Sequence, residues 1–234
     1  MNRIYRDALL ALHVSDSGIR IATGEYAPPI VGCQPGVIDY GYPPCMLSLL
    51  YEPGPSHLAA YLSWDDVSPE IVLYYDETSS CHLVGVGADA FTWRVVENVL
   101  RLDDEMTDRV RSVGGDLGVS ESDLTAIERH ACDHDELSDL SDILPSGTPR
   151  KVPSDRQFSG SAKDEHMRIA AFGKRLAAGD AQGAWHTLEQ GGWSFGSARA
   201  AVRDLLASGH VPKHMVHALQ HWLSLIRPDD HVAY

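Results

Sequence analysis

The sequence predicts an α+β protein in which an antiparallel β-meander with packing helices is followed by a small C-terminal helical bundle. Three features of the 234 residues support this class. Short β-branched and aromatic runs alternate with polar turns up to residue 86, and apolar residues recur at helical spacing from there onward. A segment rich in proline, glycine and serine separates two parts of the chain.

Strands are expected at 46–51, 58–64, 71–75 and 81–86, where β-prone residues are concentrated. The turn sequence EPGP connects the first two runs, and DETSS connects the last two. Short polar loops between β-prone runs are typical of antiparallel neighbours, so the pattern indicates a meander.

Helices are expected at about 88–102, at 106–113, from about 121 onward, and at 135–144. Ser120 and Asp123 resemble a capping box at the start of the third helix. In the fourth, Asp135, Asp139 and Asp142 are spaced so that they would line one side.

Residues 145–163 contain three prolines, two glycines and four serines, which leaves little to bury. We expect a linker or long surface loop there, between an acidic α+β domain at 1–144 and a helical bundle at 164–234. The helices of that bundle are expected at 164–178, 180–190, 194–208 and 213–226, because glycines follow the first three and Pro212 precedes the fourth.

Negative charge is concentrated in the first part of the chain. The formal net charge is −14, and residues 1–150 alone carry 9 Lys and Arg against 25 Asp and Glu. Such a field repels phosphate backbones and attracts basic proteins, although acidity also serves solubility alone. We expect a basic protein partner and no nucleic acid. The residues expected to bind that partner are Asp103, Asp104, Glu105, Asp133, Asp135, Glu136, Asp139 and Asp142.

The chain has no apolar run near the roughly 18 residues that suggest a membrane span. Its four cysteines, Cys33, Cys45, Cys81 and Cys132, form no C-x-x-C pair. These observations predict a soluble cytoplasmic protein without membrane contact.

A dinucleotide-binding fingerprint is matched in part by Gly85-x-Gly87-x-x-Ala90. Asp89 would place a carboxylate beside the pyrophosphate, and no second parallel strand follows. We therefore expect these glycines to end a strand and begin a helix, and we expect no cofactor.

A second candidate site is His130-x-Cys132-x-His134. On a continuous helix the two histidines share a side, whereas Cys132 points roughly opposite. We expect a solvated helix end, and the alternative is a metal-dependent hydrolase that uses His130 and His134 with acidic residues from elsewhere. The sequence has no G-x-S-x-G nucleophile signature.

A row of histidines lies near the C-terminus, at His210, His214, His217 and His221. The apolar residues of that helix occupy the other side, so the histidines are expected to be exposed. The row is then either a solvated face or a surface that binds a transition metal or responds to pH.

The segment IVLYYDETSSCHLVGVGADAFTWRVVENVL (71–100) combines two strands, a loop at Asp76 and a helix with Phe91 near its start. With this segment, residues 45–102 resemble the SUKH superfamily of bacterial immunity proteins. The resemblance implies a non-enzymatic protein that binds and blocks a toxin, and immunity proteins to basic nuclease toxins are often acidic. The chain departs from the family pattern because it lacks a clear glycine pair after the first helix and adds a helical half.

The sequence thus predicts an immunity or adaptor-type protein whose acidic surface neutralises a basic partner. A metal-dependent hydrolase and a structural protein that oligomerises through its helical half are the alternatives. The leading prediction requires that the acidic part hold no buried cluster of convergent titratable groups.

Overall fold

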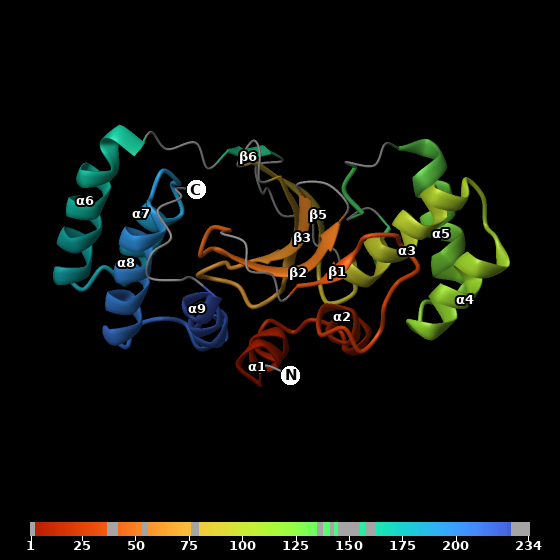
Figure 1. The fold of residues 1–234 in the computed structure, drawn as a ribbon, viewed down its shortest axis with the longest axis horizontal. Coiled ribbons are helices and arrows are strands. Elements are labelled where there is room, and N and C mark those ends of the chain that lie inside the picture. The colour runs from red at the N-terminus through yellow and green to blue at the C-terminus, as the bar shows by residue number, and fades with distance from the viewer. Residues whose placement is uncertain are drawn as a thin grey trace.

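The computed structural model describes residues 3–36, 42–52, 56–75, 80–134, 138–140, 143–144, 155–157 and 162–225. A sheet lies in the middle of the molecule, with α3–α5 at one end and α6–α8 at the other (Figure 1). The predicted α+β class, with helices following the sheet, is confirmed.

The sheet is an antiparallel meander in which six strands follow one another in chain order. The strands are β1 (Gln34–Pro35), β2 (Met46–Glu52), β3 (Ser56–Tyr61), β4 (Glu70–Tyr75), β5 (Ser80–Val86) and β6 (Asp155–Gln157). Five consecutive residues of β2 and five of β3 are buried instead of alternating with exposed ones. Helices and loops therefore cover both faces of the sheet at its centre.

Two N-terminal helices that the sequence analysis did not predict pack near β2. They are α1 (Arg3–Ala11) and α2 (Asp16–Ala22). α1 buries Tyr5, Ala8 and Leu9, a spacing that places them on one side of the helix. The Ser15 side chain accepts a hydrogen bond from the Gly18 amide and so caps α2.

After β5 the chain forms α3 (Ala90–Asp103), α4 (Asp108–Asp116) and α5 (Glu121–Asp133). The junction confirms that Gly85 and Gly87 end a strand and precede a helix, and Gly87 has a φ of 116°, which favours glycine. β5 is antiparallel to both of its neighbours, so this is no βαβ unit. The predicted cap is also confirmed, because the Ser120 side chain accepts from the Asp123 amide.

The helix expected at 135–144 is wrong for the residues of that range that are described. Residues 138–140 are not helical, and 143–144 form only a turn. The Leu140 amide donates to the Val84 carbonyl at 2.7 Å, which holds this segment along β5 instead. Within the segment expected to be a linker, β6 pairs with β5.

The C-terminal helices are α6 (Glu165–Ala177), α7 (Ala181–Leu188), α8 (Phe195–Ala207) and α9 (Lys213–Leu225), with a 3₁₀ turn, η1 (Ala162–Asp164), before them. α9 lies beside α1 (Figure 1). The Trp222 indole donates to the Tyr42 carbonyl at 2.8 Å. One cluster of buried apolar side chains includes residues of the sheet and of helices from both ends of the chain.

The expected exposure of the histidine row holds for His210 and is wrong for the three histidines of α9. His221 is fully buried, and its ring lies 4.6 Å from that of Tyr5. His214 is half-buried, and its Nε2 lies 2.8 Å from the Ser63 carbonyl oxygen. α9 is covered on more than one side, so its histidine side is largely turned inward.

Among the residues that are described, no helix has the length and apolar character needed to cross a membrane.

Candidate functional site

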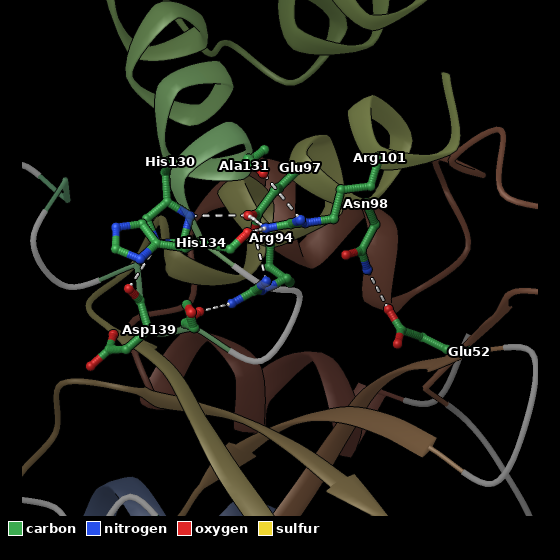
Figure 2. A network of polar contacts seen from close by, with 10 residues as sticks. Glu52, Arg94, Glu97, Asn98, Arg101, His130, Ala131, His134 and Asp139 are labelled. Atoms are coloured by element: carbon green, nitrogen blue, oxygen red, sulfur yellow. Dashed lines mark hydrogen bonds and ion pairs between the residues drawn. The ribbon is translucent and has the colours of Figure 1, made fainter. Parts of the chain in front are cut away.

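A network of charged side chains joins α3 to α5 (Figure 2). Arg94, Glu97 and Arg101 are three and four residues apart on α3, so they lie on one side of the helix. His130 projects toward them from α5. All but Arg101 are buried.

The Glu97 carboxylate is the centre of this network. It is fully buried and lies 2.6 Å from an Arg94 guanidinium nitrogen, 2.7 Å from one of Arg101, and 3.0 Å from His130 Nδ1. An ionised carboxylate buried without partners would cost several kcal/mol, which these contacts offset.

His130 lies between two hydrogen-bond acceptors. Its Nδ1 faces the Glu97 carboxylate and its Nε2 faces the Asp139 carbonyl oxygen, each at 3.0 Å. The ring is thereby held at both nitrogens, between α3 and the segment that follows α5.

The two arginines extend the network to the backbone. Arg94 donates to the Ser138 carbonyl, and burial lowers the pKa of its guanidinium while Glu97 opposes that effect. Arg101 donates to the Ala131 and His134 carbonyls at 3.3 and 3.2 Å. These bonds fix the end of α5 and the segment after it against α3.

Two expectations for this region are wrong. His130 is buried and is not part of a solvated helix end, and the acidic part of the chain does contain a buried cluster of convergent titratable groups. His134 is exposed, although its ring lies 4.7 Å from that of His130. Both ring nitrogens of His130 lie within hydrogen-bond distance of protein oxygens, so neither faces a metal site among the described residues. The described residues contain no group of three or more potential metal ligands.

An open groove of about 600 Å³ lies beside this network, between α3 and α5. It is lined by Leu100, Arg101, Asp104, Glu105, Glu128, Ala131 and Cys132. The lining therefore combines three carboxylates with the apolar side chains of Leu100 and Ala131. Arg101 lines the groove and also pairs with Glu97. The ion-pair network therefore holds one wall of the groove in place.

The structure places the residues predicted to bind a partner in different environments. Asp104 and Glu105 line the groove, Asp133 is exposed at the end of α5, and Asp139 is exposed next to the network. The Asp103 carboxylate already accepts hydrogen bonds from Thr107 and Arg109. These bonds hold the pKa of its carboxyl below the usual value. The remaining predicted residues, Asp135, Glu136 and Asp142, lie outside the described residues.

The sequence analysis missed Glu128 and Arg101. Glu128, Ala131 and Cys132 have the i, i+3, i+4 spacing of one helix face, and this spacing was a readable signal. Arg101 gives no such signal, because its place beside this face depends on the packing of α3 against α5.

The chain matches no protein-family model, no curated protein and no solved structure. The resemblance to the SUKH superfamily therefore stays a prediction.

Proposed function

We propose that this chain is a non-enzymatic binding protein of the immunity or adaptor type, which captures a basic segment of a protein partner in the groove between α3 and α5. The observation that carries the proposal is the groove itself, which Asp104, Glu105 and Glu128 line together with apolar side chains.

Charge around the groove favours a cationic partner. Residues 97–134 contain ten Asp and Glu against four Lys and Arg. Three of those arginines are held by ion pairs, with Glu97, Asp103 and Glu121. Among the residues that are described, the three groove carboxylates form no ion pair. Their field would steer a basic segment toward the groove.

Rigidity of the wall also supports a binding role. The leading prediction required that the acidic part hold no buried cluster of titratable groups, and it holds one. Because Arg94, Glu97, Arg101 and His130 contact one another and backbone carbonyls, we assign this cluster a structural role: it fixes α3 and α5 relative to each other before any partner arrives. A preformed site loses less conformational entropy on association.

A toxin domain of basic character is the partner that the SUKH resemblance implies. We place the protein in the cytoplasm, because no two of its four cysteines form a disulfide and the Cys132 thiol is exposed in the groove.

The test uses a labelled peptide of lysine and leucine as the probe, with a peptide of glutamate and leucine in the same pattern for comparison. A triple variant, D104N/E105Q/E128Q, removes three charges from the groove. We expect it to weaken binding of the basic peptide at least about tenfold and to reduce the dependence of the association rate on salt.

The matched control is D108N/D116N/E121Q, which removes the same charge from exposed residues outside the groove. Equal losses in the two triple variants would show that net charge alone attracts the peptide. That result, or no binding of the basic peptide by the unmodified protein, would contradict the proposal.

A further inference from the structure

A second groove, of about 570 Å³, lies at the opposite end of the molecule between α6 and α8 (Figure 1). Sites for small molecules typically measure about 300–1,000 Å³, and the space between helices of a bundle is one of their common places. The apolar part of the lining is made by Ile169, Phe172, Leu176, Trp193, Ala200 and Ala201.

The apolar lining determines the body of a ligand that would fit. Phe172 and Trp193 are buried and stand edge to face, with ring centroids 6.1 Å apart. Ile169 lines the same groove and is still 44% exposed. Because covering such surface removes it from water, the groove favours a hydrocarbon or aromatic group.

One ionisable side chain lines the groove, and it is the carboxylate of Asp204. Asp204 is exposed, and within the described part of the chain its side chain forms no ion pair or hydrogen bond. The two hydroxyls of the lining are already engaged. Ser208 donates to the Leu205 carbonyl at 2.6 Å, and Ser197 is bonded to the Ser194 hydroxyl at 3.0 Å. Asp204 is therefore the polar group that is left to select a ligand.

The basic residues of α6 and α8 do not line the groove. Two of them are held elsewhere, because Arg168 donates to the Gly192 carbonyl and Arg175 donates to the Gly183 carbonyl. A cation that enters the groove thus meets a carboxylate, and the lining presents no positive charge to repel it.

We infer that the α6–α8 groove is a binding site for a small apolar amine, a molecule with a hydrocarbon or aromatic body and one ammonium group. The body lies against Phe172 and Ile169, and the ammonium pairs with the Asp204 carboxylate. A few placed polar groups in an apolar pocket fix the orientation of a ligand in this way. The site is separate from the acidic groove, so the inference does not depend on the proposed function.

The test follows amide chemical shifts of the full chain during titration with 4-phenylbutylamine, and with 4-phenylbutanol as its uncharged counterpart. We expect the amine to bind with a Kd of about 1 mM or tighter and to shift residues of α6 and α8. Since an exposed ion pair contributes up to about 1 kcal/mol, D204N should weaken amine binding about three- to fivefold and leave alcohol binding unchanged.

The matched control for charge is D116N, at an exposed residue of α4 that lies at the other end of the molecule. It should leave amine binding unchanged. A200F, which places a ring at an exposed position in the groove, should abolish binding of both probes. A170F, the same change on α6 outside the lining, should not affect it.

Four results would overturn the inference. They are no binding of the amine to the unmodified protein, equal affinities for the amine and the alcohol, equal losses in D204N and D116N, and equal losses in A200F and A170F.

Discussion

At the scale of single residues, Glu97 illustrates how one buried charge organises a site. Its carboxylate pairs with Arg94 and Arg101 and contacts His130, so substitution E97Q should leave the buried Arg94 guanidinium without this counter-charge. Because removing one partner of a buried pair is strongly destabilising, we expect a loss of at least about 3 kcal/mol in the free energy of unfolding. Urea denaturation measures it.

The comparison variant for E97Q is E121Q, which breaks the exposed ion pair with Arg111. An exposed pair contributes less than about 1 kcal/mol, so this variant should unfold almost like the unmodified protein. Equal effects of the two substitutions would show that the network does not stabilise the fold in the way its geometry indicates.

The sequence could not have predicted this network. The spacing of Arg94, Glu97 and Arg101 on one helix side is readable, but it is also the spacing of ordinary surface pairs. What makes the cluster special is His130, 33 residues further along the chain than Glu97. Only the packing of α5 on α3 brings the two together, and no local pattern encodes that contact.

At the scale of elements, local sequence signals predicted most of the helices and strands. Glycines and caps that predicted helix ends, such as Ser120 and Gly179, lie within a few residues of the observed boundaries. The missed helix α1 has its buried residues at helical spacing, so its sequence carried a readable signal. The histidine side of α9 was assigned to solvent because periodicity identifies one apolar side and does not show that neighbours cover others.

Two glycines provide an element-scale prediction. A β-carbon at Gly36, just after β1, would overlap the Ser48 carbonyl oxygen on the adjoining strand β2, which also accepts a 2.7 Å hydrogen bond from Tyr5. G36A should therefore cost about 1–3 kcal/mol of stability. The same change at Gly115, on α4, meets no atom within 4 Å and should be neutral or stabilise by up to about 1 kcal/mol.

Thermal or chemical denaturation of the two glycine variants measures the difference. If G36A were as stable as G115A, the close approach of β1 to β2 and α1 would be wrong.

At the scale of the whole molecule, the two parts of the chain are bound to each other as well as distinguished by charge. α9 packs against α1, and the Tyr61 hydroxyl donates to the Glu189 carboxylate at 2.7 Å. The change in composition at 145–163 therefore marks a change of charge, while the apolar core continues across it. A perturbation of α9 should accordingly be felt by the sheet.

Acidification perturbs α9 through His221. Burial lowers the pKa of this imidazole to about 4, so the folded protein resists its protonation. In the unfolded chain the pKa is near 6.5, so between these values the unfolded state binds the proton more readily. The neutral ring therefore contributes stability that is lost as pH falls from about 6.5 toward 4, on the order of 3 kcal/mol in full.

Unfolding free energies measured across this range, for the protein and for H221F, isolate the effect from that of the carboxylates. H221F keeps an aromatic ring against Tyr5 but cannot titrate, so its stability should fall less on acidification, and equal falls would show that His221 does not couple α9 to pH.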